Sequence, residues 1–293
     1  MLIYDHPLFR PPSESRSLIF QITIGCSRNL CVFCGMYKGK KFRVRPIEEV
    51  SAEIDSIPAP LRASVDRVFL ADGDALVYPY SGLLEILDHL SATFPNLARI
   101  GSYASPQSLS TKSPDELHAL REKKLRVLYF GLESGDDETL FSVNKGFTTA
   151  EMEREAQKAR EAGMKLSVTA ILGLAGRDRS IEHARATAAW VNRVNPEFFS
   201  LLTLFHRHNK GFLKHLNQCN RGELLLEARE LVAGLNPAKT ILRSNHVSNF
   251  LLLSGSYPKD RERLIADVDT AISCARTVPG YLEGMPEYGE EYY

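Results

Sequence analysis

The sequence lacks the features that mark three broad classes of protein. No apolar run approaches the roughly 20 residues that a membrane-spanning helix needs. Acidic and basic residues balance at 36 each, so net charge gives no argument for a nucleic acid or an anionic membrane as partner. The N-terminus has no basic segment followed by an apolar core, and we therefore expect no signal peptide.

Cysteine is scarce, and its distribution is not that of a disulfide framework. The chain holds five cysteines, three of them close together near residue 30. Disulfide-rich secreted proteins usually have an even number. We therefore expect a reduced, cytoplasmic protein, in which clustered thiols more often bind a metal or act in catalysis. Cys219 and Cys274 are single and distant, so we expect both to be buried small side chains rather than ligands of a second cluster.

Short β-rich runs alternate with amphipathic helical patterns along most of the 293 residues. Runs typical of strands lie at 18–25, 67–71, 98–103, 125–132, 164–173 and 196–205. Helical patterns begin at Pro46, Ser81, Ser113, Thr148 and Ser180. Six strand–helix repeats predict a parallel α/β sheet with helices outside, as a closed or incomplete barrel. An open doubly wound sheet is the alternative.

The repeating pattern loosens after the sixth run. Helices near 223–235 and 259–276 flank the segment 240–253, which can hold a further strand. No linker rich in Gly, Ser or Pro interrupts the chain. We predict an N-terminal arm over residues 1–17, a barrel core over 18–205, and a C-terminal helical extension over 206–293 that closes the barrel and contributes to the substrate site.

Cys26, Cys31 and Cys34 follow the first predicted strand. They therefore lie in a loop at the carboxyl end of a strand, where α/β barrels carry their active sites. A structural zinc site prefers four ligands, and no further Cys or His lies nearby. A 4Fe–4S cluster usually takes four thiolates, so three would leave one iron open to a small molecule. Zinc and three unliganded core cysteines are the alternatives, although the neighbours Ser27 and Arg28 are not core-like.

This loop, placed after the first strand of a repeating β/α chain, resembles that of the radical S-adenosylmethionine (radical SAM) superfamily. The first gap has four residues where the family usually has three, which predicts a bulge. The last gap, with Phe33 before Cys34, fits the family pattern. The resemblance covers roughly residues 18–205. It implies a partial (β/α)6 barrel, one 4Fe–4S cluster on Cys26, Cys31 and Cys34, and Phe33 against the SAM adenine.

A second motif ends the strand predicted at 67–71. Asp72, Gly73 and Asp74 stand where the superfamily usually has Gly-Gly-Glu-Pro, so the central glycine and an acid are kept. The resemblance implies that the backbone of this turn binds the SAM amino group. A plain strand-to-helix turn is the alternative interpretation.

The segment 131–146, GLESGDDETLFSVNKG, is similar to one found in a particular branch of the family. That branch holds oxygen-independent coproporphyrinogen oxidase, the elongator catalytic subunit and the methylthiotransferases. By this resemblance, Glu133 contacts the SAM ribose or methionine and Lys145 its carboxylate. A cation there also makes physical sense, because it neutralises a carboxylate bound beside a negatively charged cluster. Ser102 and Ile171 fall at two further strand ends that commonly touch SAM.

The resemblance implies a radical SAM enzyme that cleaves SAM into methionine and a 5′-deoxyadenosyl radical, which abstracts hydrogen from a substrate. We expect a small molecule rather than a peptide or RNA, since no second cysteine set, cobalamin domain or RNA-binding domain is visible. The family also implies a reducing partner such as flavodoxin or ferredoxin. A non-catalytic iron–sulfur electron carrier and a zinc-stabilised binding module are the rival interpretations.

Two groups of polar residues each have more than one possible role. A basic run follows the cysteines: Lys38, Lys40, Lys41, Arg43 and Arg45. It offsets cluster charge, docks an acidic electron donor, or is a solvated loop. Further on, His206 and His208 are metal ligands, a substrate clamp or a polar strand end. Asn245, His246 and Asn249 line the substrate end of the barrel or form a surface turn.

Overall fold

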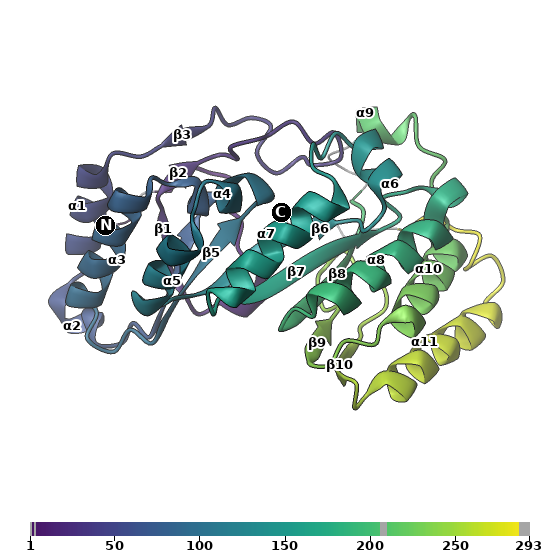
Figure 1. Cartoon of the computed structure of the whole chain (residues 1–293). Coiled ribbons are helices and arrows are strands. Elements are labelled where there is room, and N and C mark those ends of the chain that lie inside the picture. The colour runs from purple at the N-terminus through teal and green to yellow at the C-terminus, as the bar shows by residue number, and fades with distance from the viewer. Residues whose placement is uncertain (1, 3, 206–209, 287–293) are drawn as a thin grey trace. The chain divides into compact units, whose positions relative to one another are not determined.

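The computed structural model describes residues 2, 4–205 and 210–286 (Figure 1). These residues form two compact units. The first comprises residues 1–29, 36–130 and 154–166, and the second comprises 30–35, 131–153 and 167–293. The strand order is β1-β4-β5-β6-β7-β8-β9-β10, and a two-stranded β2-β3 sheet is separate.

The first unit has a parallel arrangement of strands with helices between them. Its strands are β1 (Leu18–Gln21), β4 (Arg67–Ala71), β5 (Arg99–Ala104) and β6 (Leu125–Glu133), the last of which ends in the second unit. Its helices are η1 (Pro12–Glu14), α1 (Ile47–Asp55), α2 (Ala59–Arg62), η2 (Ala75–Val77), α3 (Tyr80–Thr93), α4 (Pro106–Ser110) and α5 (Pro114–Glu122). The antiparallel pair is β2 (Thr23–Ile24) with β3 (Arg43–Val44).

The second unit continues the parallel pattern and ends with one antiparallel strand. Its strands are β7 (Lys165–Leu172), which begins in the first unit, β8 (Phe198–Thr203), β9 (Thr240–Arg243) and the antiparallel β10 (Ser254–Tyr257). Its helices are α6 (Asp137–Ser142), η3 (Arg177–Arg179), α8 (Ser180–Val194), α9 (Lys210–Leu213), α10 (Arg221–Gly234) and α11 (Arg261–Arg276). Helix α7 (Thr149–Glu161) contributes residues to both units.

Local sequence signals account for most helix starts. Helix α5 begins with a capping box in which Ser113 and Glu116 satisfy each other's backbone N–H groups. Glu151 bonds in the same way with Thr148 before α7. The predicted cap at Ser81 is wrong, because α3 begins at Tyr80 and Ser81 lies inside its first turn.

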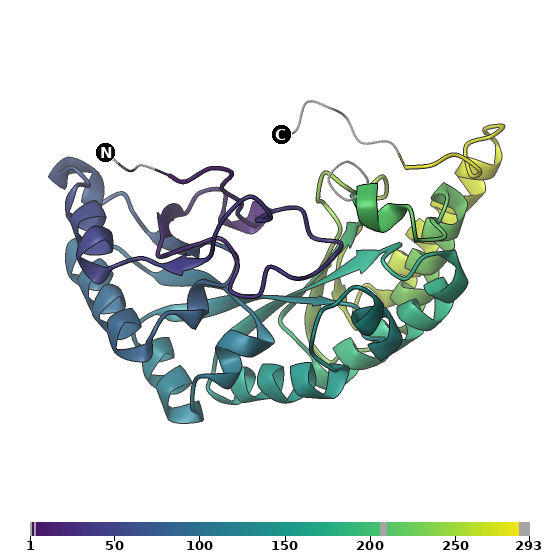
Figure 2. The same ribbon diagram turned by 90° about the horizontal axis from the view of Figure 1, so that it is seen from above.

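One face of the first unit's sheet carries an apolar cluster. Strand register places alternate residues in shared rows, so that Ile19, Phe69, Gly101 and Val127 face the same side. Tyr103 and Tyr129 form the next row on this side, and the N-terminal residues Tyr4 and Leu8 pack against the cluster. Figure 2 shows the N-terminal segment running across these strands. The predicted N-terminal arm therefore covers one face of the sheet.

The six predicted strands are all present. The first is split by Ile22 into β1 and β2, and the segment 240–253 does contain β9. The structure divides into units whose boundaries do not follow the predicted limit at residue 205, and the three-part domain assignment stays a prediction. Of the two isolated cysteines, Cys219 is buried as expected, but Cys274 is exposed on α11, so that expectation is wrong. Within the described residues, no helix is long and apolar enough to cross a membrane.

Candidate functional site

The three clustered cysteines are partly exposed. Cys26 belongs to the first unit, and Cys31 and Cys34 belong to the second. In residues 2, 4–205 and 210–286, no three Cys, His, Asp or Glu side chains gather as ligands of a single metal ion do. Each thiolate of a 4Fe–4S cluster binds its own iron, so cluster ligands do not converge on one point. The zinc alternative therefore gains no support, and cluster binding stays a prediction.

The loop segment 30–35 is fixed to the second unit through its backbone. The Val32 N–H donates to the Val143 carbonyl at 3.0 Å, and the Asn144 amide donates to the Leu30 carbonyl at 3.3 Å. Both contacts come from the turn after α6, in the segment that carries the family resemblance. This turn therefore positions the second half of the cysteine loop.

Phe33 is buried in an apolar cluster of the second unit together with Ile171. Val143 and Leu174 belong to the same cluster, and Cys31 and Cys34 pack against it. Phe33 therefore anchors the loop between these two cysteines to the carboxyl end of β7. Phe33, predicted to border the SAM adenine, and Ile171, predicted to touch SAM, lie in one cluster.

Glu133 and Lys145 form an ion pair at the carboxyl end of β6. The Lys145 Nζ donates to Glu133 Oε1 at 3.0 Å, and the two side chains are 11% and 14% exposed. Glu133 has a φ of +66°, in the left-handed region that L side chains rarely adopt. A Cβ on Gly131 would lie 2.2 Å from Glu133 Oε1, so a larger residue there would require the folded-back carboxylate to shift. The sequence predicted both residues, and the structure brings them together.

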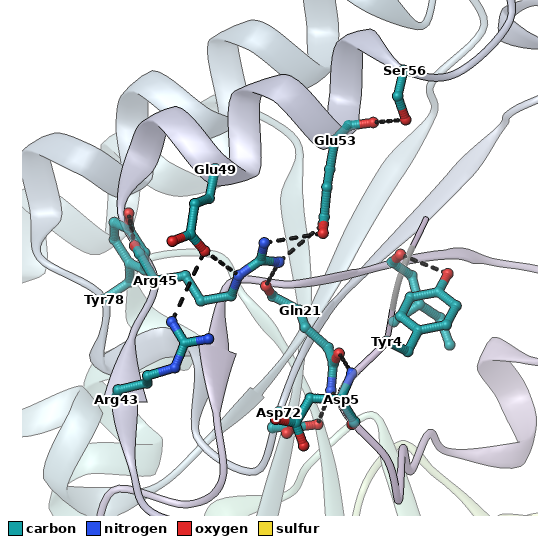
Figure 3. A network of polar contacts seen from close by, with 11 residues as sticks. Tyr4, Asp5, Gln21, Arg43, Arg45, Glu49, Glu53, Ser56, Asp72 and Tyr78 are labelled. Atoms are coloured by element: carbon teal, nitrogen blue, oxygen red, sulfur yellow. Dashed lines mark hydrogen bonds and ion pairs between the residues drawn. The ribbon is translucent and has the colours of Figure 1, made fainter. Parts of the chain in front are cut away.

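The carboxylate of Asp72 is committed to the protein itself. It accepts hydrogen bonds from the Gly25 N–H at 3.1 Å, from Gln21 Nε2 at 3.1 Å and from Lys40 Nζ at 3.0 Å. Figure 3 shows Asp72 beside Gln21, whose amide also bonds with Asp5. This side chain ties the end of β4 to the start of the cysteine loop, so any contact of Asp72 with a ligand would have to come from its backbone.

Asp74 is fully buried, and one of its two carboxylate oxygens is unsatisfied. Its Oδ2 accepts from Ser27 and from Ser105, the latter at 2.7 Å. Its Oδ1 has no hydrogen-bond partner among the described residues. Burial raises the pKa of the Asp74 carboxyl, although the serine hydroxyls oppose this. An ammonium group reaching Oδ1 would supply the missing donor, so the site fits the cationic amino group of an amino acid.

Gly73 allows a close approach between this turn and the cysteine loop. A Cβ at this position would lie 2.6 Å from the Tyr37 ring and 3.1 Å from the Cys26 Cβ. The first contact is too short to occur and the second is tight, so any larger residue would displace the Tyr37 ring and crowd Cys26. The second motif and the first cysteine are thereby packed together within the first unit.

Two of the five residues in the basic run after the cysteines are structural. Lys40 is buried against Asp72, and Arg45 pairs with Glu49 and Glu53 at 3.2 and 2.9 Å (Figure 3). Neither is available to dock an electron donor or lie in a solvated loop, so both interpretations are wrong for these two residues. They stay open for Lys38, Lys41 and Arg43, which are exposed.

The predicted SAM contact on β5 lies on the opposite side of the strand from the tyrosine cluster. Ser102 is buried in the row of Leu70, and its hydroxyl donates to the Tyr103 carbonyl at 3.0 Å. Tyr103 lies on the other face, where its ring meets Phe69 and Tyr129. Sequence reasoning missed Tyr103, and only the strand register could have found it.

A buried polar cluster supports the end of β7, and no local sequence pattern predicts it. Glu227, on α10, accepts from the Gly173 N–H at 2.9 Å and from the Ser180 hydroxyl at 2.5 Å. His183 Nε2 lies 3.5 Å from Glu227 Oε1, and its Nδ1 bonds with Ser134 at 2.7 Å. Burial raises the pKa of Glu227 to about 7 and lowers that of His183 to about 4.

The polar residues of the C-terminal part differ in their roles. His206 and His208 lie outside the described residues. Asn249 joins two strand ends, since its amide donates to the Leu201 and Ser244 carbonyls at 2.7 and 2.9 Å. His246 packs against the Phe205 ring, and Asn245 is exposed. Asn249 is thus a structural residue, and whether Asn245 or His246 lines a substrate site stays open.

Comparison with known proteins identifies the family. The profile described as Radical SAM superfamily matches residues 20–190, more than half of the chain. The chain belongs to the radical SAM superfamily. Members of this family are enzymes that use a 4Fe–4S cluster and SAM. The predicted family, cofactors and enzyme class are thereby confirmed at the level of the family.

Individual relatives support the predicted branch and fold. A tRNA-2-methylthio-N(6)-dimethylallyladenosine synthase of Coxiella burnetii is 26% identical over 178 residues, covering 57% of this chain and 39% of that protein. The coproporphyrinogen III oxidase structure from Escherichia coli aligns with a TM-score of 0.59 at 20% identity, covering 74% of this chain and 51% of that one. The methylornithine synthase structure aligns with a TM-score of 0.54 at 15% identity, covering 86% and 68%.

These similarities cover part of the relatives' length and the fold of this chain. The chain spans less than half the length of the curated relatives that it matches. The structural neighbours share its fold, which confirms the predicted α/β class with a mostly parallel sheet.

Proposed function

We propose that this chain is a radical SAM enzyme whose single 4Fe–4S cluster is held by Cys26, Cys31 and Cys34. The observation that carries the proposal is the unsatisfied, buried Oδ1 of Asp74. It lies in the turn whose Gly73 packs on the Cβ of Cys26, so a cation-binding carboxylate sits in the same unit as the first cysteine. An electron carrier without a ligand would have no use for such an oxygen, since its burial costs about 1–3 kcal/mol.

The protein's own residues would hold the parts of SAM separately. Asp74 would accept the amino group, Lys145 the carboxylate, and Glu133 the ribose or the methionine portion. Phe33 and Ile171 would border the adenine. When bound, the cluster supplies the electron for reductive cleavage of SAM to methionine and a 5′-deoxyadenosyl radical, which takes hydrogen from the substrate.

We further propose a small-molecule substrate in preference to a peptide or RNA. The first unit's sheet offers little open surface on its apolar side, because Tyr4 and Leu8 of the N-terminal arm cover it. The electron would come from a low-potential protein such as flavodoxin or ferredoxin. A cytoplasmic location fits an enzyme with an oxygen-sensitive cluster.

The test is a SAM cleavage assay after anaerobic reconstitution with iron and sulfide. Dithionite supplies electrons, and 5′-deoxyadenosine and methionine are quantified by mass spectrometry. The Cys31→Ala variant removes one proposed ligand, and Cys274→Ala is the matched control because that thiol is exposed on α11. We expect both products from wild type and Cys274→Ala and neither from Cys31→Ala. A cluster without SAM binding or cleavage would favour the electron carrier, and one zinc without sulfide would favour the binding module.

A further inference from the structure

The second unit's sheet has one face that helices α8, α10 and α11 leave open. Along β8, the residues Phe199, Leu201 and Thr203 are buried, whereas Phe198, Ser200 and Leu202 are partly exposed. Strand β9 alternates in the same way, with its last residue fully exposed. Figure 2 shows helices α8, α10 and α11 on the other side of the strands, whereas Leu213 of the short helix α9 joins the cluster of Ile171 at the carboxyl end of β7. Ligand groups can therefore reach the open face.

One row across this face is polar. The register pairs Thr169 of β7 with Ser200 of β8, Ser200 with Arg243 of β9, and Arg243 with Ser254 of β10. All four residues are partly or fully exposed. Neighbouring strands lie about 4.8 Å apart, so adjacent members of the row can contact one small ligand.

Arg243 has no acidic partner among the described residues, which distinguishes it from most arginines of this unit. Its Nη1 donates a hydrogen bond to the carbonyl of Leu242, the residue before it, at 2.9 Å. Arginines of the unit that pair with an acid are Arg177, Arg179, Arg185, Arg193, Arg229, Arg261 and Arg263. A guanidinium carries five donors, so Arg243 has donors left for an anion.

The row adjoins the predicted adenosyl site. The next row toward the carboxyl ends pairs Ile171 with Leu202, and the cluster that contains Phe33 is built on it. Two residues along a strand span about 6.6 Å. A group bound at Thr169, Ser200 and Arg243 would therefore lie one row from the residues proposed to border the SAM adenine.

We propose that Thr169, Ser200 and Arg243 bind a carboxylate of the substrate. The inference rests on the proposed function, because it assigns these residues to the substrate side of the same site. Arg243 would bind the carboxylate oxygens in bidentate geometry, and the two hydroxyls would each donate one hydrogen bond. A single cation matches the single charge of a carboxylate, whereas a phosphate dianion would leave charge uncompensated. The substrate is accordingly a small carboxylic acid.

The test uses propionate as a probe on the full chain, with saturation-transfer NMR and titration as the readout. Propionamide is the neutral isostere, and inorganic phosphate is the competing anion. Each is titrated into wild type, Arg243→Gln, Arg243→Lys and the control Arg276→Gln, which alters an exposed arginine at the end of α11. Lys145→Met is included so that propionate bound at the proposed SAM carboxylate position is recognised.

We expect Arg243→Gln to weaken propionate binding about tenfold, in line with the loss of a charge-assisted bidentate contact. Arg243→Lys should give an intermediate affinity because the charge stays but the fork is lost. Arg276→Gln should bind like wild type, and propionamide should bind weakly throughout. The site would be overturned by absent propionate binding, by equal losses in Arg243→Gln and Arg276→Gln, or by phosphate outcompeting propionate through Arg243.

This test is independent of the chemistry proposed above. The affinity for propionate is measured on the protein whether or not it cleaves SAM. Arg276→Gln should also produce 5′-deoxyadenosine without substrate at the wild-type rate. A protein that cleaves SAM but ignores propionate contradicts only the carboxylate site, and one that binds propionate through Arg243 without cleaving SAM contradicts only the proposed function.

Discussion

Lys145 Nζ lies 3.0 Å from Glu133 Oε1, and this ion pair lies at the carboxyl end of β6. The two residues are twelve positions apart and both belong to the motif shared with the radical SAM branch. The pair is mostly buried, so each side chain depends on the other for charge compensation. An ammonium has three donors, so Lys145 can hold Glu133 and still accept an anionic ligand.

The pair gives a prediction that separates stability from ligand binding. Lys145→Met should lower the free energy of unfolding by about 1–3 kcal/mol, because Glu133 loses its partner. It should also weaken SAM binding about tenfold. The double variant Lys145→Met, Glu133→Gln should recover stability without recovering SAM affinity. Urea unfolding and equilibrium SAM binding measure the two effects, and parallel recovery of both would show that Lys145 acts only by stabilising the fold.

Gly73 provides a steric test of the turn after β4. In Gly73→Ala, the new Cβ collides with the Tyr37 ring and crowds Cys26, so we expect the reconstituted protein to retain less than about half of its iron. Gly39→Ala is the matched control, because nothing lies within 4 Å of a Cβ there. Iron and sulfide analysis is the measurement. Equal iron retention in the two variants would mean that the turn does not position Cys26.

The buried pair of Lys40 and Asp72 predicts a stability effect inside the basic run. Lys40→Met leaves the Asp72 carboxylate buried without its cation, which should cost about 3 kcal/mol in the free energy of unfolding. Lys41→Met, at the adjacent exposed position, should change it by less than about 0.5 kcal/mol. Chemical denaturation compares them. Similar small changes in the free energy of unfolding of both variants would indicate that Lys40, like Lys41, belongs to a solvated loop.

His183 and Glu227 predict opposing pH effects. The pKa of Glu227 is raised from 4.5 to about 7, so between these values the folded protein holds a proton that the unfolded chain has lost. Stability from Glu227 therefore falls as pH rises through this window. The pKa of His183 is lowered from 6.5 to about 4, so stability from His183 rises with pH between about 4 and 6.5. Between pH 4.5 and 6.5 the two effects oppose each other.

Glu227→Gln isolates the histidine contribution. From pH 4.5 to 6.5, the unfolding free energy of the variant should rise relative to that of wild type by up to about 1 kcal/mol per pH unit. Thermal or urea unfolding across this range measures the difference. His183→Gln should show the reverse trend. Parallel pH profiles for wild type and Glu227→Gln would show that the carboxyl group does not titrate in this window.

The strands and the motif residues could be predicted from sequence for clear physical reasons. Buried parallel strands are continuous apolar runs, as in β6, and polar caps mark helix starts such as that of α5. Strand β10 was missed because its sequence, SGSY, has little β propensity and gains its pairing from β9.

Long-range partners were beyond the reach of sequence. Ser105, which donates to Asp74, lies 31 positions from it in the sequence. Glu227, which accepts from the Gly173 N–H, lies 54 positions from Gly173. Nothing local signals either contact. The face on which a strand residue lies also depends on register, which is why the place of Tyr103 beside the apolar cluster was not predicted.

The most direct test of the central claim is the electron paramagnetic resonance spectrum of the reduced, reconstituted protein, recorded with and without SAM. Three cysteine ligands leave one iron open, so SAM binding should change the spectrum of the wild-type cluster. The Asp74→Asn variant should need a higher SAM concentration for the same change. A reduced 4Fe–4S spectrum that stays the same at saturating SAM would contradict the account.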